Sequence, residues 1–354
     1  MKAQSYNTFW QRIHQAAKTK AFPLRVMFEL TYKCNFRCRH CYVPLSYRKK
    51  EELKTKEIFS ILDQLVEIGC FYLGFTGGEP FMRKDIMDIL WYAKRCGFEI
   101  IIYTNGSLID KRMADGLSLL KPNKVDITIP AMSKGAFERI TRMRDSHRKV
   151  FGAIDLLHKR GVNLGFKTCV LKENESEIKD IQDFAHSLGA FHRLDDMLSL
   201  RLDGSEEPYR YRGILEQNSV AGNTYHAARN ASRVSRSTSH VTRDTCYLVS
   251  DTRDLFRCGV GLSQGAITPL GELKMCLMID YPKYKILKQK SLEETWEKLK
   301  RTVASVKPDK DYKCDRCGLQ PYCKWCPARA WLSNRSFTSC EPESRRWAQR
   351  KDNH

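Results

Sequence analysis

The stretch LRVMFELTYKCNFRCRHCY (residues 24–42) places three cysteines directly after an apolar run that is typical of a buried strand. Cys34, Cys38 and Cys41 fall within eight residues, so a short loop can hold three thiols around one metal centre. Thiolates favour iron-sulfur clusters or zinc over hard cations, and spacings of three and then two residues are unusual for structural zinc. The motif therefore predicts an iron-sulfur cluster with one iron free of protein ligands, with zinc as the alternative.

Short β-rich runs alternate with segments of helical period over residues 22–200, which is typical of consecutive βα units. A helix is expected from Thr55 to just before Gly69, and another over residues 85–96. We expect strands at residues 24–30, 71–76, 98–104, 124–130, 162–171 and 191–200. Six such units predict an α/β fold, a partial (β/α)6 TIM-like barrel with ligands at the carboxyl ends of its strands.

The length of 354 residues allows more than one domain. We expect a helical extension at 1–21, with a helix at 8–17 across the barrel bottom, and the barrel core at 22–202. A linker or bridging region at 203–245, a cysteine-rich domain at 246–345 and a basic tail at 346–354 would follow. Residues 228–244 are basic and serine-rich, which indicates a linker or mobile loop, with a surface helix as the alternative.

The formal charge of +20 would attract nucleic acid, an anionic membrane or an acidic peptide, and it also suits a plain solvated surface. No helix-turn-helix, RNA-binding aromatic signature or zinc-finger spacing accompanies the charge, so nucleic acid is a minor alternative. The chain has no long apolar run and its first residues do not resemble a signal peptide. We therefore expect a cytoplasmic location, no membrane partner and reduced thiols.

Eight of the fourteen cysteines lie in the last 109 residues, which indicates a module built around metal. Cys258, Gly271 and Cys276 have C-x12-G-x4-C spacing. A quartet with C-x2-C-x5-C-x2-C spacing follows, formed by Cys314, Cys317, Cys323 and Cys326. One further cysteine, Cys340, comes after it. Seven thiols exceed the needs of one site, and the quartet alone suits zinc or iron-sulfur equally. Three others, Cys70, Cys96 and Cys169, lie in apolar or β-rich stretches and are expected to be small buried residues.

The cysteine loop is followed by TGGEP (residues 76–80) at the end of the next strand and by YTNG (103–106) at the end of the third. This combination resembles the radical S-adenosylmethionine (SAM) superfamily. The resemblance implies a 4Fe-4S cluster on the three cysteines of the loop and cleavage of bound SAM. It implies cofactor contacts from Gly77, Gly78, Glu79, Pro80, Tyr42, Asn105, Thr128 and Lys167. The chain departs from the family after the fourth strand, where Pro130, Ala131 and Met132 replace an aromatic residue and a glycine.

The cysteines near the carboxyl terminus resemble those of the SPASM domain, an extension of radical SAM maturases that carries auxiliary 4Fe-4S clusters. The resemblance implies one auxiliary cluster on Cys258, Cys276 and Cys326. It implies a second on Cys314, Cys317, Cys323 and Cys340. No cysteine lies between Cys258 and Cys276, so one iron of the first auxiliary cluster would be open or would take Cys246 as a ligand.

Together these resemblances imply an oxidoreductase that modifies a side chain of a ribosomally made peptide or protein, by a crosslink or thioether. A radical enzyme for a small molecule or tetrapyrrole is one alternative, and a non-catalytic metal-cluster or nucleic-acid-binding protein is another. The run LSLRLDGSEEPYRYRG (198–213) resembles a segment of peptide maturases, with Arg201 and Asp203 either at the barrel mouth or in a salt-bridged loop.

The roughly 20 residues before the first strand are too few for a built-in leader-binding domain, a small domain of typical size being larger. The expected partners are therefore a peptide, a separate leader-binding protein and a reducing protein such as flavodoxin or ferredoxin. The sequence identifies no catalytic base.

Overall fold

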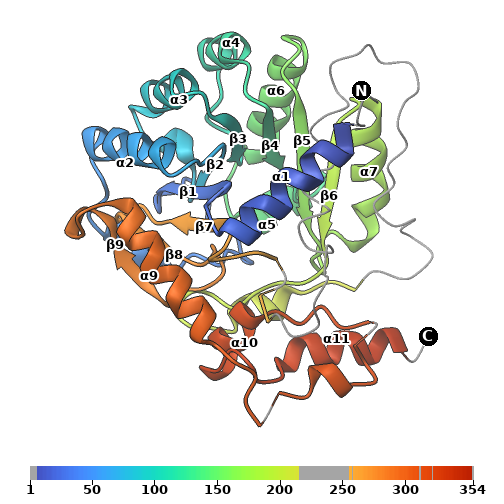
Figure 1. Cartoon of the computed structure of the whole chain (residues 1–354). Coiled ribbons are helices and arrows are strands. Elements are labelled where there is room, and N and C mark those ends of the chain that lie inside the picture. The colour runs from blue at the N-terminus through green and yellow to red at the C-terminus, as the bar shows by residue number, and fades with distance from the viewer. Residues whose placement is uncertain (1–5, 215–254, 257, 311, 321, 353–354) are drawn as a thin grey trace.

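The computed structural model describes residues 6–214, 255–256, 258–310, 312–320 and 322–352 (Figure 1). Cys246 and the linker expected at 228–244 lie outside these residues. In the described part of the chain, no helix is long and apolar enough to cross a bilayer.

One sheet runs through the described structure in the order β6-β5-β4-β3-β2-β1-β7-β8-β9. Its first six strands are parallel, at β1 (Arg25–Thr31), β2 (Tyr72–Gly77), β3 (Glu99–Thr104), β4 (Lys124–Thr128), β5 (Leu164–Cys169) and β6 (Phe191–Asp195). Among the described residues the two edge strands, β6 and β9, do not pair with each other. The sheet is therefore an open, partial barrel, and the predicted fold class is confirmed.

Helices cover the outer face of this sheet (Figure 1). They are α2 (Thr55–Glu67), α3 (Ile86–Arg95), α4 (Lys111–Leu120), α5 (Lys134–Thr141), α6 (Ser146–His158) and α7 (Ile178–Ser187). In α2 the buried residues Ile58, Ile61, Leu62 and Leu65 recur at helical spacing, so one stripe faces the sheet. The strands turn Phe28, Phe75 and Phe166 toward this layer, each fully buried, and alternate residues face the inside of the barrel.

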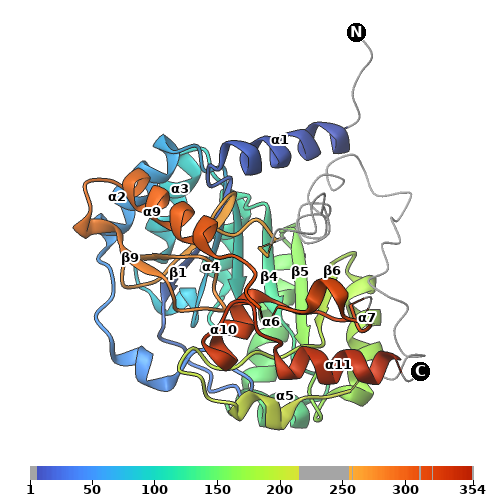
Figure 2. The same cartoon turned by 60° about the horizontal axis from the view of Figure 1, so that its bottom comes forward.

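The helix expected at 8–17 is present as α1 (Tyr6–Lys20). Its Ala17 packs against Leu24 and Tyr72, which lie at the starts of β1 and β2. Figure 2 shows α1 at one end of the sheet and α5 toward the opposite end. The mouth at the carboxyl ends of the strands is therefore left to the loops that carry the predicted site.

Three expected strands are too long at their carboxyl ends. The fourth stops at Thr128 because Pro130 has no N–H to continue the ladder. The fifth stops at Cys169, where the Asn174 amide donates hydrogen bonds to the carbonyls of Cys169 and Pro130 and turns the chain away. The sixth stops at Asp195 rather than residue 200.

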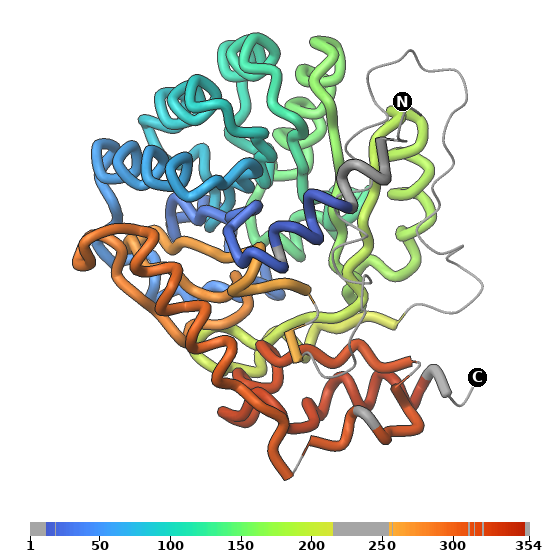
Figure 3. Tube along the Cα trace, in the orientation of Figure 1, coloured from blue at the N-terminus to red at the C-terminus, as the bar shows by residue number. Residues whose placement is uncertain are grey.

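The carboxyl-terminal segment joins the barrel sheet directly, which the sequence did not predict. β7 (Gln264–Ile267) pairs in parallel with β1, and β8 (Glu272–Lys274) and β9 (Lys283–Lys285) continue antiparallel. Figure 3 shows this segment running beside the first strand. The segment continues through α9 (Leu292–Ser305), α10 (Pro327–Asn334) and α11 (Pro342–Asp352). The first strand of the sheet thus lies between β2 and a strand from the carboxyl-terminal segment.

Candidate active site

The loop that carries Cys34, Cys38 and Cys41 begins three residues after β1. Burial raises the pKa of all three thiols, and the charge of Cys41 raises those of Cys34 and Cys38 further. Such mutual effects need short separations, so the loop brings the three sulfurs together. Arg48 Nη1 donates to the Cys34 carbonyl at 2.7 Å and Nη2 to the Phe36 carbonyl at 2.8 Å, which fixes the loop's shape.

Gly77 and Gly78 lie against the backbone that leads into this loop. Gly78 N donates to the Thr31 carbonyl at 2.7 Å, and Glu79 N donates to the Lys33 carbonyl at 2.8 Å. A Cβ on Gly77 would lie 2.2 Å from the Thr31 oxygen, and one on Gly78 would lie 2.3 Å from the Lys33 oxygen. Any side chain at either position would push the cysteine loop away. The glycines therefore serve this backbone contact, whereas the sequence suggested only a close approach to a ligand.

The Glu79 carboxylate ties the end of β2 to the end of β3. It is fully buried, with Oε1 accepting from Thr104 Oγ1 at 2.7 Å and Oε2 accepting from Asn105 N at 2.7 Å. Burial raises the pKa of Glu79 to about 7, and the hydrogen bonds oppose that rise. Pro80 follows and begins a short 3₁₀ turn, η2 (Pro80–Met82).

Asn105 lies beside the first thiol. Its Nδ2 donates to Asn35 Oδ1 at 2.9 Å and lies 3.9 Å from Cys34 Sγ. Its Oδ1 accepts from Ser107 Oγ at 2.7 Å, and Asn35 Nδ2 donates to that same hydroxyl at 2.8 Å. The sequence indicated Asn105 but missed Asn35 and Ser107, since neither belongs to a motif by itself.

Tyr42 takes part in a buried network of charged side chains. Its hydroxyl donates to Glu29 Oε1 at 3.1 Å, and Glu29 Oε2 lies 3.1 Å from Lys274 Nζ. Glu29 and Lys274 are 0% and 1% exposed. A buried ion pair between β1 and β8 therefore supports Tyr42, the residue that follows Cys41. Lys274, the cation of this pair, lies two residues before Cys276 in the sequence.

Thr128 and Lys167 are neighbours in the register of β4 and β5. Lys167 Nζ pairs with Asp195 Oδ2 at 2.9 Å, and Arg193 Nε lies 3.4 Å from Asp195 Oδ1. Cys169 belongs to the same face, and its charge contributes to the raised pKa of Cys38. The expectation that Cys96 and Cys169 are buried is wrong, since both are partly exposed, whereas Cys70 is buried. Cys169 belongs instead to the candidate site.

The segment 198–213 links the cysteine loop to the carboxyl-terminal region. Arg201 Nε donates to the Cys41 carbonyl at 3.3 Å, and Arg201 Nη1 pairs with Glu207 Oε2 at 2.7 Å. Arg201 thus contacts the cysteine loop and also belongs to a salt-bridged loop. The salt-bridged loop was one of the two alternatives expected from the sequence. Asp203 Oδ1 accepts from Ser205 N within this loop, at 3.0 Å.

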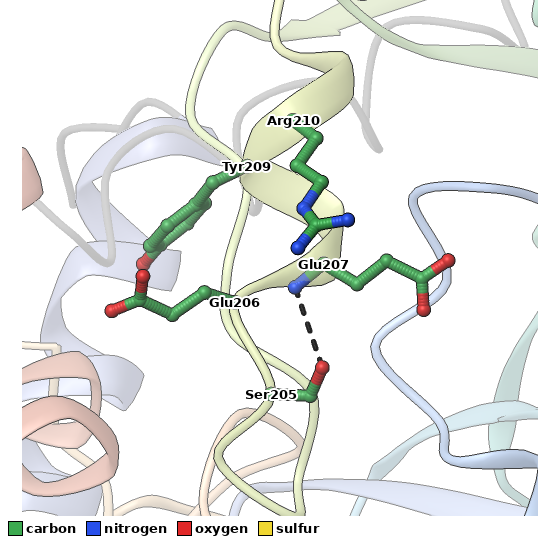
Figure 4. Close-up of a pocket in the computed structure, with 5 residues that line it drawn as sticks. All are labelled: Ser205, Glu206, Glu207, Tyr209 and Arg210. Carbon is green, nitrogen blue, oxygen red and sulfur yellow. Dashed lines mark hydrogen bonds between the residues drawn. The ribbon is translucent and has the colours of Figure 1, made fainter.

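The far end of this segment contacts the residues that follow Cys340. Tyr209 OH donates to Glu341 Oε1 at 3.5 Å, and Arg212 Nη1 pairs with Glu343 Oε1. An open pocket of about 550 Å³ lies on the segment, lined by Ser205, Glu206, Glu207, Tyr209 and Arg210 (Figure 4). In Figure 4, Glu206 and Tyr209 extend to one side of the ribbon and Glu207 to the other. The segment is therefore a polar bridge between the two cysteine-bearing regions.

The other cysteines gather in two groups. Burial, with added repulsion from Cys326 and Cys258, raises the pKa of Cys276 to about 12. Burial and the charges of Cys340 and Cys317 raise the pKa of Cys323. Cys314 begins the 3₁₀ turn η7 (Cys314–Arg316) that leads to Cys317. Cys276 thus lies near Cys258 and Cys326, and Cys323 lies near Cys317 and Cys340.

The residues at all three groups fit iron-sulfur clusters in their chemistry, because each group offers neighbouring thiols, the donors that such clusters take. No group of three Cys, His, Asp or Glu side chains among the described residues is arranged to hold a single metal ion.

Residues 28–185 match the model of the Radical SAM superfamily. Fe-coproporphyrin III synthase of Methanosarcina barkeri is 32% identical over 166 residues, which cover 45% of this chain and 40% of the synthase. PqqA peptide cyclase of Gluconobacter oxydans is 27% identical over 169 residues, which cover 48% of this chain and 47% of the cyclase. The chain thus spans less than half the length of these two relatives.

A solved structure extends the likeness beyond that domain. Streptococcus suis SuiB bound to its precursor peptide SuiA superposes with a TM-score of 0.66, covering 97% of this chain and 82% of SuiB. The two chains are 17% identical, so the likeness concerns the fold. The superposition therefore extends over the carboxyl-terminal region of this chain as well as its parallel sheet.

Proposed function

We propose that this protein is a radical SAM enzyme with a SPASM domain that oxidatively modifies a side chain of a ribosomally made peptide or protein. The observation that carries the proposal is the contact of Gly78 and Glu79 with the backbone of Thr31 and Lys33, just before the three thiols. It joins the SAM motif to the cysteine loop. When bound, the cluster would supply the electron that cleaves SAM into methionine and the 5'-deoxyadenosyl radical that attacks the substrate.

The chain's own residues would hold and shape this centre. Cys34, Cys38 and Cys41 would hold the cluster, with Arg48 and Arg201 fixing the loop through its carbonyls. Gly77 to Pro80, Tyr42 and Asn105, with Thr128 and Lys167 on the inner face of the barrel, would contact SAM. The two further cysteine groups would hold auxiliary clusters that accept an electron from the substrate. Net oxidation, by a crosslink or thioether, would follow.

A peptide is the favoured substrate because PqqA peptide cyclase is a relative and SuiB, a fold neighbour, binds a precursor peptide. A tetrapyrrole is the second candidate, favoured by the higher identity to Fe-coproporphyrin III synthase. The inner face of the barrel carries Lys167 and Arg193, both of which pair with Asp195, so one positive charge of these three groups remains for a carboxylate of either substrate.

We propose domain boundaries at 1–21, 22–202, 203–245, 246–345 and 346–354, although β7 to β9 extend the sheet of the core. A cytoplasmic location would keep the thiols reduced, and a leader-binding protein and a flavodoxin or ferredoxin would be the partners.

The test begins with anaerobic reconstitution of the full chain, followed by reduction with dithionite in the presence of SAM. Release of 5'-deoxyadenosine, measured by chromatography, is expected for the wild type. It should be lost in Cys38→Ala and retained in the control Cys96→Ala, since Cys96 lies outside all three cysteine groups. Zinc in place of iron and sulfide, or intact SAM, would refute the enzyme assignment.

The substrate is tested with peptides encoded beside the gene and, in parallel, with coproporphyrin III and its iron complex. A peptide that loses two hydrogens by mass spectrometry is the expected result. A modified tetrapyrrole together with unchanged peptides would select the second candidate.

A further inference from the structure

Five exposed arginines lie on the cysteine loop or on the segment from α5 to α6 that contacts it, namely Arg37, Arg139, Arg142, Arg144 and Arg148, and we call them the arginine patch. Four of them belong to α5, α6 and the turn between these helices. Residues 134–149 hold six Lys and Arg but only two carboxylates, Glu138 and Asp145. The patch is therefore strongly positive.

The patch is in direct contact with the loop that would hold the cluster. Arg37 lies between Cys34 and Cys38, and its N–H donates to the Thr141 carbonyl at 3.0 Å. Arg39 N donates to the Ile140 carbonyl at 3.2 Å. The end of α5 thus packs against the cysteine loop, and the exposed Arg142 and Arg144 follow directly after that end.

Among the described residues none of the five arginines has a carboxylate oxygen within 4.0 Å, although Arg139 is near enough to Glu177 to contribute to the lowered pKa of that carboxyl. Arg39, by contrast, pairs with Glu173 at 3.9 Å. Glu138 Oε1 accepts from Asp145 N at 3.0 Å, so one of the two local carboxylates is used within the turn. Unpaired, exposed charge beside a functional loop suits an electrostatically complementary partner.

The position of the patch favours a protein that delivers electrons over a substrate. A substrate must reach the inner face of the barrel, where Lys167 and Arg193 lie. An electron donor only has to approach the cluster from outside, and Arg37 projects from the cluster loop itself. Encounters between redox proteins are small, weak and guided by charge, which an exposed arginine patch provides.

We propose that the arginine patch is the docking surface for an acidic one-electron donor protein of the flavodoxin or ferredoxin kind. The inference rests on the proposed function, because it requires a cluster on Cys34, Cys38 and Cys41. In the step concerned, the donor loses one electron and the cluster gains it. No bond is made or broken and no proton moves.

The test uses the reconstituted full-length protein and a reduced acidic flavodoxin as the probe. Two charges of the patch are reversed in the double variant Arg142→Glu/Arg144→Glu. The same two charges are preserved in Arg142→Lys/Arg144→Lys. A control, Lys288→Glu/Arg301→Glu, reverses two exposed charges at α9 and just before it. Stopped-flow absorbance measures oxidation of the donor at several salt concentrations. The same samples are then reduced with dithionite, which needs no docking surface, and 5'-deoxyadenosine is measured.

The patch reversal is expected to slow electron transfer from flavodoxin at low salt by about tenfold or more and to flatten its salt dependence. The lysine variant and the α9 control should stay within about twofold of the wild type, because charge carries the effect. Dithionite-driven release of 5'-deoxyadenosine should be unchanged in all three variants.

Equal flavodoxin rates in the patch reversal and the wild type would overturn the docking assignment. A fall in the dithionite-driven reaction as well would place the arginines in the fold of the site and also overturn it. Loss of binding to an acidic peptide, with normal flavodoxin rates, would assign the patch to the substrate. Failure of the proposed function is distinct from these results, since the wild type itself would then not cleave SAM with dithionite.

Discussion

Lys274 Nζ lies 3.1 Å from Glu29 Oε2, and both side chains are buried. Glu29 belongs to the first strand of the parallel sheet and Lys274 to the carboxyl-terminal hairpin. Tyr42, which follows Cys41, donates its hydroxyl to the same carboxylate. One buried ion pair therefore connects the loop of the first three cysteines with the strand that leads to Cys276.

Removing one partner of this pair should destabilise the protein strongly. Lys274→Met leaves the Glu29 carboxylate buried without its cation, which typically costs about 3–5 kcal/mol of unfolding free energy. Urea unfolding of the metal-free protein, followed by circular dichroism, measures this cost. Lys159→Met is the control, because the Lys159 and Asp155 pair is exposed and should change stability by less than about 1 kcal/mol.

The double variant Glu29→Gln/Lys274→Met removes both charges and should be less destabilised than the sum of the single variants. Additive losses would show that the two groups do not interact, contrary to the observed geometry.

Gly78→Ala should separate the SAM motif from the cysteine loop. The new Cβ would lie 2.3 Å from the Lys33 carbonyl oxygen, so the backbone before Cys34 must move. We expect a loss of about 2 kcal/mol or more in unfolding free energy and reduced iron incorporation. Unfolding curves and iron analysis after reconstitution measure the two effects.

Gly152→Ala is the matched substitution, since Gly152 lies in α6 and its Cβ would meet no atom within 4 Å. It should be neutral or stabilise the protein by up to about 1 kcal/mol. If Gly78→Ala behaved like Gly152→Ala, the close contact with Lys33 would be refuted.

Glu79 should make the metal-free protein less stable as pH rises. Its pKa is about 7 in the folded state, against an ordinary value of 4.5, so between these values the folded state holds a proton that the unfolded chain has lost. Stability conferred by the protonated carboxyl is therefore present below pH 4.5 and is lost as pH rises to 7. The expected change is about 3 kcal/mol over this window.

Glu79→Gln removes this titration, so its free energy of unfolding should decline less between pH 5 and pH 7 than that of the wild type. Urea titrations at the two pH values measure the difference. Identical slopes in both proteins would mean that Glu79 is ionised throughout, despite its burial.

The two carboxyl-terminal cysteine groups predict how much iron each variant loses. Cys276→Ala and Cys326→Ala each remove a thiol from the group that contains Cys258, and Cys323→Ala removes one from the group that contains Cys340. Each single variant should lose about one cluster's iron because a missing thiolate weakens the site. Cys276→Ala/Cys326→Ala should lose no more than either single variant, whereas Cys276→Ala/Cys323→Ala should lose two clusters' iron.

Iron and sulfide analysis of the reconstituted proteins gives these values. Equal losses in the two double variants would contradict the separation into two groups, and Cys96→Ala should lose none.

Local sequence was sufficient for the features that lie close together along the chain. The three-then-two spacing of the cysteines, the glycines at the end of β2 and the alternation of strands and helices can all be seen in short windows. Strand ends were less predictable. Asn174 ends β5 by contacting two carbonyls from different loops, and no local pattern shows that.

Residues from distant parts of the chain were missed where they meet. Cys169 had the pattern of an ordinary strand residue, yet the register of β5 places it on the inner face near Cys38. Arg48 belongs to no motif, and Arg201 was indicated only for the barrel mouth or a salt-bridged loop, although both bind carbonyls of the cysteine loop. Their roles depend on where the fold places their guanidinium groups, and a short stretch of sequence does not determine that position.

The sequence by itself determined the class of chemistry, because thiol spacing and strand-end glycines are properties of a short length of backbone. Only the tertiary structure decided that β7 pairs with β1 and that Lys274 meets Glu29. The edge of β1 that is not paired with β2 can hydrogen-bond to any strand that packs well beside it. A four-residue strand such as QGAI has too little periodicity to be recognised in the sequence. These long-range contacts depend on the packing of the whole sheet.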